Sequence, residues 1–411
     1  MRLAVTGFVE AEAGSVASAN ALLLGALLDR GVRVDFFSKA SFVDPRPIAG
    51  NHPGFTFHDT DNRIPDRLRR KVAGWPVAGL IARMLDVWTY NRLVVRSIRE
   101  ASRRKKFDAC LWMGDYARGS IPGIPTVSMG QGPPGTDARS VINRFDEIRR
   151  LAGLPSALKW SLLALARLSR IGLPVFGHSD HIIVASSRSL ESLHSIYRVP
   201  LSQVSVLPFP LALEKFRFVP GVAATGPLRC LWLGRIVPRK RIDLFLDGAA
   251  TVIRSGTPLA LTVVGKVGFI RGYERLIETF PFPGSLKRID HVDRSGIPDL
   301  LRAHDVLVQP SEEEDFGSSV AEAQACGIPV IVGATNGTGD YLCRRDLRLS
   351  DYQPETLCKA LIRLAALKAN NAMGDPSESR RSAEEHFSAE RVAERLVTIL
   401  KGVVVNSTKA P

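Results

Sequence analysis

The sequence of 411 residues lacks the features that stabilise small secreted proteins and membrane proteins. Its five cysteines include no Cys-x-x-Cys pair, so we expect buried thiols in a reducing compartment. No uninterrupted apolar run approaches the roughly 18–20 residues of a spanning helix. The first residues have the pattern of a strand and a loop, not of a signal peptide. These absences favour a cytoplasmic protein, soluble or peripheral to a membrane.

Acidic residues are in deficit. Asp and Glu number 41 against 55 Lys and Arg, which gives a formal net charge of +14. The excess lies in the first half, where residues 1–205 hold 28 basic and 17 acidic side chains. Such a surplus favours anionic partners, namely phosphorylated ligands or an anionic membrane surface. We expect no nucleic-acid partner, because no known binding motif accompanies the charge. The hydrophobic content of 45% excludes a wholly disordered chain.

Strand and helix patterns alternate along both halves of the chain, which is typical of parallel sheets with helical crossovers. The expected strands of the first half span 2–7, 32–38, 107–114, 125–130 and 181–187. Those of the second half span 228–235, 259–266, 306–311 and 328–333. The pattern predicts two α/β halves, 1–205 and 206–375. A last helix over 382–402 and a loose tail complete the segment 376–411.

The segment 310–333 carries a pair of carboxylates. Glu314 and Glu322 are eight residues apart, about 12 Å on a continuous helix. They are therefore too far apart to share a metal ion, but they could grip separate parts of an extended ligand. Free N–H groups at the helix start, with Ser318 and Ser319, suit an anionic ligand. The alternative is structural, because Ser311 and Glu314 also fit a helix capping box.

Two cations follow the expected strand 228–235. Gly234-Arg235 stands at its end and Lys240 lies five residues further on. An Arg and a Lys at this place suit a pyrophosphate. The alternative is a basic surface turn. The dinucleotide-binding pattern G-x-G-x-x-G is not present at this turn, and no D-x-D motif accompanies the cations.

Together these segments resemble the second domain of GT-B glycosyltransferases, in particular glycosyltransferase family 4, the group 1 glycosyltransferases. The family pattern runs G-R, K-G, a strand ending in Gly, then P-S-x-x-E-x-F-G-x-x-x-x-E-A-x-A-x-G-x-P-V. This sequence supplies Gly234-Arg235, Lys240, Val264-Gly265 and 310–330 in register. Arg241 stands where the family often has Gly. The resemblance covers about 206–400 well and the first half only in its fold pattern.

The resemblance implies two Rossmann-like domains with parallel sheets facing across a cleft. It also implies transfer of a sugar, with retention, from a UDP-, GDP- or ADP-sugar to a glycan, lipid-linked or small-molecule acceptor. Arg235 and Lys240 would hold the donor diphosphate, and Glu314 would lie beside the donor sugar. The remaining donor contacts would come from Gly234, Val292, Phe316, Gly317, Ser318, Ser319 and Glu322, with Glu322 on the ribose. No cofactor and no divalent metal are expected.

The acceptor side is weaker in the sequence. The family usually has paired glycines in the first loop, where this chain has only Gly14, and a mid-domain His, where it has Gln131. Asp115 and Asp137 lie on expected strand-end loops. These departures keep open the alternative of a non-catalytic nucleotide-sugar-binding or assembly protein. The runner-up among enzymes is a different GT-B chemistry such as phosphorolysis of a glycan, but no motif for the pyridoxal-phosphate lysine of that variant is evident.

A basic amphipathic helix is expected over 157–172. Lys159, Arg167 and Arg170 fall on one side of it, and Trp160 and several leucines fall on the other. Such a helix suits contact with an anionic membrane surface at the cytoplasmic face. The alternative is an ordinary domain helix that packs its apolar face on a sheet.

Overall fold

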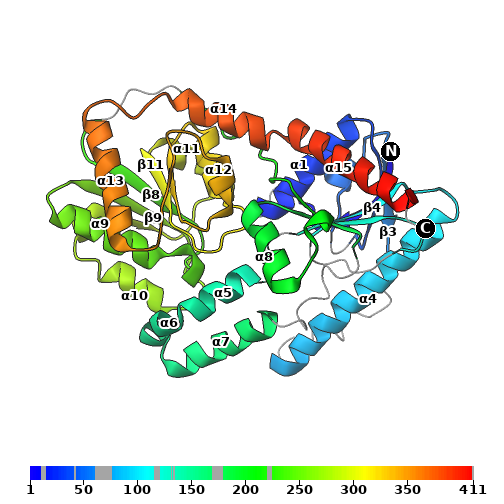
Figure 1. The fold of residues 1–411 in the computed structure, drawn as a ribbon, viewed down its shortest axis with the longest axis horizontal. Helices are drawn as coiled ribbons and strands as arrows, with labels where there is room; N and C mark the ends of the chain where they lie inside the picture. Colours follow the sequence, from blue (N-terminus) through cyan, green and yellow to red (C-terminus); the bar gives the residue numbers. More distant parts are fainter. Residues whose placement is uncertain are drawn as a thin grey trace.

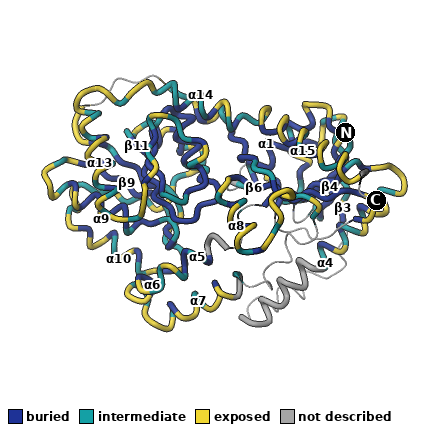
Figure 2. The backbone as a smooth tube through the Cα atoms, viewed as in Figure 1, coloured by how far each residue is buried: buried dark blue, intermediate teal, exposed yellow. Residues whose placement is uncertain are grey.

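The chain forms two parallel β-sheets, each flanked by helices, in the computed structural model (Figure 1). The structure describes residues 1–10, 15–40, 43–60, 76–114, 121–130, 132, 135–168, 179–219 and 225–409. The two sheets lie side by side along the longest axis of the molecule, and their buried strands form its two inner layers (Figure 2). This arrangement confirms the predicted α/β fold with two Rossmann-like units.

The first sheet has the strand order β3-β2-β1-β4-β5-β6-β7, and every pairing in it is parallel. Its strands are β1 (Arg2–Gly7), β2 (Arg33–Ser38), β3 (Phe55–Asp59), β4 (Ala109–Met113), β5 (Thr126–Met129), β6 (His181–Val184) and β7 (Val204–Val206). The central strands β4 and β5 are fully buried, and β4 is apolar on both faces, as expected of a sheet covered by helices on both sides.

The second sheet has the order β10-β9-β8-β11-β12-β13, again all parallel. Its strands are β8 (Leu228–Leu233), β9 (Leu259–Val264), β10 (Leu286–Ile289), β11 (Val306–Gln309), β12 (Val330–Val332) and β13 (Leu347–Arg348). The strand order reverses between β8 and β11. In open sheets of this kind ligands bind at such a switch point, beyond the carboxyl ends of the strands.

The helices of the first unit are α1 (Ser15–Asp29), α2 (Arg46–Ala49), α4 (Pro76–Ser102) and α8 (Ser187–Tyr197). Three further helices, α5 (Gly135–Asn143), α6 (Phe145–Ala152) and α7 (Leu154–Leu168), precede residue 205 but lie under the second sheet (Figure 1). Ile148 and Ala157 are buried in the core of that sheet, and Tyr273 Oη donates to Glu147 Oε1 at 2.7 Å. The core of the second unit therefore draws on residues of the first half.

The second sheet carries α9 (Ile242–Arg254), α10 (Gly272–Glu278), α11 (Ile297–Arg302), α12 (Ser318–Ala325) and α13 (Pro354–Ala369). The chain then returns to the first unit through α14 (Pro376–Phe387) and α15 (Ala389–Lys409) (Figure 1). Leu396 and Leu400 of α15 are buried in the first core with Leu23 and Leu27 of α1. The last helix therefore joins the two units.

The prediction of one helix over 382–402 with a loose tail is wrong in two respects. The helix is broken at Ser388, which is extended, because Phe387 is buried in the second unit while Val392 belongs to the first core. The predicted tail is helical as far as Lys409, and Val403 and Val404 pack against the first core. Burial of these valines accounts for the extra helical turns.

Candidate active site

The predicted donor residues gather beyond the carboxyl ends of β8 and β11. The backbone of Gly234 has φ +151°, and a Cβ added there would lie 3.7 Å from Cε of Lys240. Lys240, at the end of a 3₁₀ turn over Pro238–Lys240, therefore extends across the end of β8. Gly265 meets the same turn from β9, where a Cβ would lie 1.8 Å from the Gly234 carbonyl oxygen. Gly265 is needed for this close approach, and the positive φ of Gly234 favours glycine there.

Glu314 is the centre of a buried charge cluster. The residue is 6% exposed and forms ion pairs with Arg239 and Lys240. Burial alone would raise the pKa of its carboxyl group, but the attraction of the two cations outweighs it and holds the pKa at about 2. The structure thus brings Lys240 and Glu314 together, as predicted from the sequence. It adds Arg239, which the sequence analysis missed although it stands beside Lys240.

Glu322 has a different environment on α12. It is 2% exposed, and its Oε1 lies 2.7 Å from Nη1 of Arg294. Burial raises the pKa of Glu322, and Arg294 offsets that rise only in part. The guanidinium of Arg294 also lies 5.5 Å from the ring centroid of Phe216. Arg294 lies after β10, two residues beyond the predicted Val292, and was not itself predicted from the sequence.

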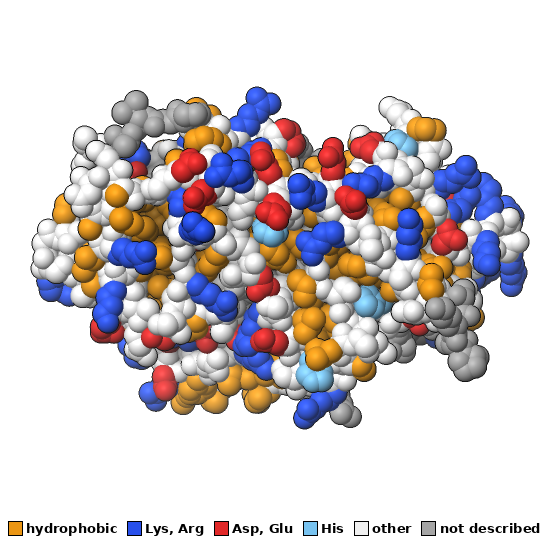
Figure 3. Space-filling view, turned by 45° about the horizontal axis from the view of Figure 1, so that its top comes forward, with side chains coloured by type: hydrophobic (Ala, Val, Ile, Leu, Met, Phe, Trp, Pro, Cys, Tyr) orange, Lys and Arg blue, Asp and Glu red, His pale blue; other side chains and the backbone are white. Residues whose placement is uncertain are grey.

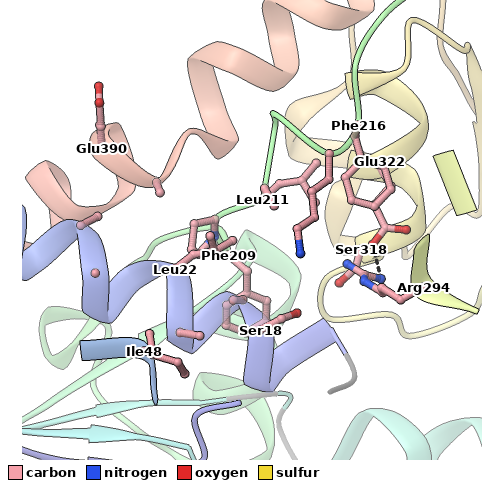
Figure 4. Close-up of a pocket in the computed structure, with 18 of the residues that line it drawn as sticks. Ser18, Leu22, Ile48, Phe209, Leu211, Phe216, Arg294, Ser318, Glu322 and Glu390 are labelled. Carbon is pink, nitrogen blue, oxygen red and sulfur yellow. Dashed lines mark ion pairs between the residues drawn. The ribbon is translucent and has the colours of Figure 1, made fainter. Parts of the chain in front are cut away.

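A cavity of about 930 Å³ opens beside this ion pair, between the two units (Figure 4). Figure 4 shows Glu322, Arg294 and Ser318 at one end and Ser18, Leu22 and Ile48 toward the other. Its wall is lined by Phe209, Leu211 and Phe216, which lie in the segment between β7 and β8. The volume is within the range of about 300–1,000 Å³ that is usual for small-molecule sites. Helix α1 of the first unit therefore faces the carboxylate of the second across a space large enough for a ligand.

The loop before α12 differs from the capping-box alternative. The helix begins at Ser318 with Gly317 as its N-cap, so Glu314 lies outside it. Since Glu314 binds two cations, Ser311 and Glu314 do not cap a helix. Glu314 and Glu322 are consequently not on one continuous helix, and the spacing estimate of about 12 Å does not apply to them.

The other predicted donor residues lie in different surroundings. Phe316 is buried among Phe209, Tyr341 and Phe387, so its ring belongs to the core. Ser318 lines the cavity, whereas Ser319 Oγ accepts a hydrogen bond from Gln309 Nε2 at 2.6 Å. A Cβ at Gly317 would lie 2.5 Å from Gln309 Oε1, so a larger residue here would displace the Gln309 side chain. Val292 is half-buried against the hydrophobic cluster beneath α12.

Arg235 lies apart from the cavity. Its side chain is exposed and lines a groove between α5, α7 and the turn after β8. Among the residues that the structure describes, no carboxylate forms an ion pair with Arg235. The structure therefore places Arg235 and Lys240 on the same turn but in different surroundings.

Three consecutive residues of α8 in the first unit contact two loops of the second unit, the loop of Glu314 and the 3₁₀ turn Gly337–Tyr341. The Ser187 N–H donates to Asp340 Oδ2 at 2.7 Å, Arg188 pairs with Glu313, and the Ser189 hydroxyl donates to Asp315. Glu313 has a left-handed backbone with φ 55°, which is uncommon for a residue other than glycine. The contacts of Arg188 and Ser189 hold the loop of Glu314 from the opposite unit. No sequence pattern indicated these contacts.

Most of the predicted acceptor residues cannot be placed. Gly14, Asp115 and Gln131 lie outside the described residues, and Asp137 is in α5 but its side chain is not described. Gly132, the neighbour of Gln131, is described. A Cβ added to Gly132 would lie 3.8 Å from Cβ of Asp315. The loop after β5 therefore comes close to the acidic run of the second unit.

The two parallel sheets define a GT-B type of fold, and comparisons with known proteins agree. Residues 215–380 match the family model described as "Glycosyl transferases group 1". The match falls within the part of the chain for which the sequence resemblance was specific. D-inositol 3-phosphate glycosyltransferase of Rhodococcus erythropolis is 30% identical over 258 residues, which are 56% of each chain. The chain spans about half the length of several curated relatives that it matches.

Solved structures match the fold over nearly the whole chain. HepE of Anabaena, in complex with UDP and glucose, has a TM-score of 0.62 at 14% identity, with 97% of this chain and 99% of that chain covered. Sucrose-phosphate synthase of Thermosynechococcus elongatus has a TM-score of 0.64 at 16% identity, with 99% and 100% covered. At these identities the likeness shows the GT-B fold alone. Every helix in the described ranges is too short or too polar to span a bilayer.

Proposed function

We propose that the protein transfers a glycosyl group from a nucleotide sugar to an acceptor hydroxyl. The bond between the anomeric carbon and the diphosphate oxygen breaks, and a bond forms between that carbon and the acceptor oxygen. The acceptor proton and the nucleoside diphosphate are the other products. We propose that the transfer retains the anomeric configuration, as the resemblance to glycosyltransferase family 4 implies.

The observation that carries this proposal is the cluster of Glu314, Arg239 and Lys240 at the sheet switch point. A carboxylate with a pKa held at about 2 stays ionised, so it can accept hydrogen bonds from sugar hydroxyls at any physiological pH. The two cations beside it can stabilise a departing diphosphate, whose negative charge grows in the transition state. A solved relative of the same fold holds UDP and glucose.

The donor would extend from this cluster toward Glu322. We propose that Glu322 accepts hydrogen bonds from the ribose, that the backbone from Gly317 to Ser319 borders the phosphates at the start of α12, and that Val292 meets the base. The burial of Glu322 supports this placement, because a ligand that donates hydrogen bonds would compensate a carboxylate whose pKa is raised. We propose no divalent metal, since Arg239 and Lys240 already supply positive charge. Retention of activity in EDTA tests that part.

The test is a screen of UDP-, GDP- and ADP-sugars by thermal shift, followed by measurement of nucleotide release. Ligand that binds only the folded chain raises its stability by mass action. Binding with acceptor-dependent release of a nucleoside diphosphate would support transfer. Binding without release in the presence of glycan, lipid-linked and small-molecule acceptors would favour the non-catalytic alternative. Stabilisation by none of the sugars contradicts the proposal.

We further propose that the protein works at the cytoplasmic face of an anionic membrane. The support is α7, where the leucines at 154, 158, 162, 163 and 165 are 48–66% exposed. The same helix packs Ala157, Trp160 and Ala164 on the second unit, so the alternative of a packed domain helix holds for one side only. The side chains of Arg167 and Arg170 are not described. Sedimentation with anionic vesicles at low salt, and its loss at high salt, tests this proposal.

A further inference from the structure

The loop that carries Glu314 is acidic at every position that the family pattern leaves open. Glu312, Glu313 and Asp315 occupy those positions in P-S-x-x-E-x-F-G. Together with Glu314 they form a run of four carboxylates, none of which is more than 9% exposed. On the face shown in Figure 3, acidic side chains instead lie singly or in small groups among basic ones. A buried carboxylate is costly unless it is paired, so the residues that bind these side chains also hold the loop.

Glu312 and Asp315, which flank the central pair of the run, are bound by the first half of the chain. Asn143 Nδ2 of α5 donates to Glu312 Oε1 at 3.0 Å. The Ser189 hydroxyl of α8 donates to Asp315. Glu314, in contrast, pairs with two cations of the second unit. Both halves of the chain therefore hold the loop.

Glu313 makes the closest charged contact between the loop and the first unit. It pairs with Arg188 of α8, whereas Arg139 of α5 lies 3.8 Å from its other oxygen, too far for a hydrogen bond. The backbone of Glu313 has φ 55°. A side chain other than glycine keeps such a conformation only where its surroundings fix it. Arg188 thus helps to fix the residue directly before Glu314.

The start of α8 also touches the loop through a glycine. Gly337 N–H donates to the Glu314 carbonyl oxygen at 2.8 Å. A Cβ added to Gly337 would lie 2.0 Å from the Asp315 carbonyl oxygen and 2.4 Å from Oγ of Ser186, the N-cap of α8. Gly337 therefore fills the space between α8 and the loop, and it leaves no room for a side chain. The position of the loop depends on the position of α8.

We propose that Arg188 is a positioning residue for glycosyl transfer. By holding Glu313, it keeps the next carboxylate, Glu314, in the place where it pairs with Arg239 and Lys240. Arg188 acts through the loop and not on the donor itself. The cluster in the second unit is consequently complete only while α8 of the first unit is docked on it. This inference rests on the proposed function for the reaction whose rate Arg188 affects.

Arg188→Gln in the full chain tests the proposal. The donor is UDP-glucose, or the GDP- or ADP-sugar that stabilises the chain in the screen described above. We expect kcat for nucleotide release to fall at least tenfold, with KM and the calorimetric donor affinity within about threefold, because the donor contacts of the second unit remain. Arg188→Lys keeps the charge and should retain kcat within about threefold. An unchanged kcat in Arg188→Gln, or a loss of affinity alone, would overturn the proposal.

Glu191 provides a matched control. It is the second carboxylate that pairs with Arg188, at 3.4 Å, and its side chain is 65% exposed. Glu191→Gln removes this exposed pair and leaves the pair with Glu313, so kcat should stay within about twofold. If Glu191→Gln lowered kcat as much as Arg188→Gln does, the contact with the loop would not be the cause, and the proposal would fail.

A double-mutant cycle tests whether Arg188 acts through Glu313. Two residues that act independently lower the rate by the product of their separate effects, whereas two residues that act through one contact do not. We expect Arg188→Gln combined with Glu313→Gln to be no more than about twofold slower than the slower single variant. A rate equal to the product of the two separate effects would reject the route through Glu313.

Hydrogen exchange measures the loop without any donor. The amides of residues 312–316 should exchange at least tenfold faster in Arg188→Gln than in the parent and in Arg188→Lys, while the amides of β8 should not change. Unchanged loop exchange beside a lowered kcat would overturn the positioning role. The two proposals stay separable. A parent that releases no nucleotide rejects the proposed function, and an active parent with an equally active Arg188→Gln rejects this inference alone.

Discussion

The two buried carboxylates of the second unit are held in opposite electrostatic states. Glu314 lies between Arg239 and Lys240, and its pKa is lowered to about 2. Glu322 is buried as fully, but within the described part of the chain it forms an ion pair with Arg294 alone, and its pKa is raised. The difference comes from the number and placement of cations, not from the depth of burial. One carboxylate is therefore fixed as an anion, and the other is sensitive to what lies beside it.

This contrast assigns different tasks to the two ends of the proposed donor. A carboxylate that stays ionised is a poor general acid at neutral pH, so Glu314 can orient a sugar and hold two cations but cannot donate a proton. Glu322 gains from any ligand that donates hydrogen bonds to it, because such bonds favour its charged form. The cluster around Glu314 would mainly set the rate of transfer, and Glu322 would mainly set the affinity for the donor. The variants below test that division.

The largest effect is expected at the first end, for Lys240→Ala. Loss of one preorganised charge at the leaving group costs on the order of 2–4 kcal/mol. We expect kcat for nucleotide release to fall roughly 30- to 1,000-fold while KM for the donor changes much less. Lys240→Arg, which keeps the charge, should retain more activity than the alanine variant. If Lys240→Ala released nucleotide at the rate of the parent, Lys240 would not bind the diphosphate. The alternative from the sequence, a basic surface turn, would then be favoured.

Glu322→Gln should weaken donor binding much more than it lowers kcat. A hydrogen bond to a charged group contributes about 1.5–3 kcal/mol, so donor affinity should fall about 10- to 150-fold in calorimetry. The melting temperature should not fall, because glutamine removes the cost of a buried charge. Glu390→Gln is the matched control, since Glu390 lines the far end of the same cavity (Figure 4). Unchanged donor affinity in Glu322→Gln would contradict the ribose assignment.

Lowering the pH should reduce the stability that the ionised Glu314 contributes to the fold. Its pKa in the folded state is below the ordinary value of 4.5, so its contribution to stability is complete above that pH and is lost as the pH falls toward 2. Between pH 5 and pH 3 this loss is roughly 2 kcal/mol. The free energy of unfolding in urea should therefore fall more for the parent than for Glu314→Gln over this interval. If the free energy of unfolding fell equally with pH in the parent and in Glu314→Gln, the two cations would not be lowering the pKa of Glu314.

The sequence could predict the donor side because its residues lie in two short segments after consecutive strands of the sheet order. Lys240 and Glu314 meet wherever β8 and β11 pair, so local spacing was enough. Arg294 could not be found in this way. Its position depends on the turn after β10, two strands away from β8 in the sheet, and no spacing relates it to Glu322.

The contacts between the two units also could not be predicted from the sequence. Ser187, Arg188 and Ser189 belong to a helix of the first unit, and their partners come from loops more than 120 residues later. Helices α5 to α7 were assigned to the first unit by their place in the chain, although they pack on the second sheet. Strand and helix patterns report which face of an element is apolar, but they do not report which of two cores receives it.

The smallest effect is expected for Arg294→Gln, and it tests the second carboxylate most directly. Arg294 is the cation that partly offsets the burial of Glu322, and its side chain is 34% exposed. Because a partly exposed ion pair contributes about 1 kcal/mol or less, donor affinity at pH 8 should change no more than about fivefold. Without the arginine, however, the pKa of Glu322 should rise further.

The donor affinity of Arg294→Gln should consequently decline at a higher pH than that of the parent when the pH is lowered from 8. The reason is that a protonated Glu322 accepts hydrogen bonds from the ribose less strongly. Calorimetric titrations from pH 8 to pH 5 measure the two midpoints. Arg302→Gln removes an arginine of α11 that does not line the cavity, and it should leave the midpoint in place. An identical midpoint in Arg294→Gln would show that burial alone sets the charge of Glu322, and the contrast with Glu314 would then depend on its two cations only.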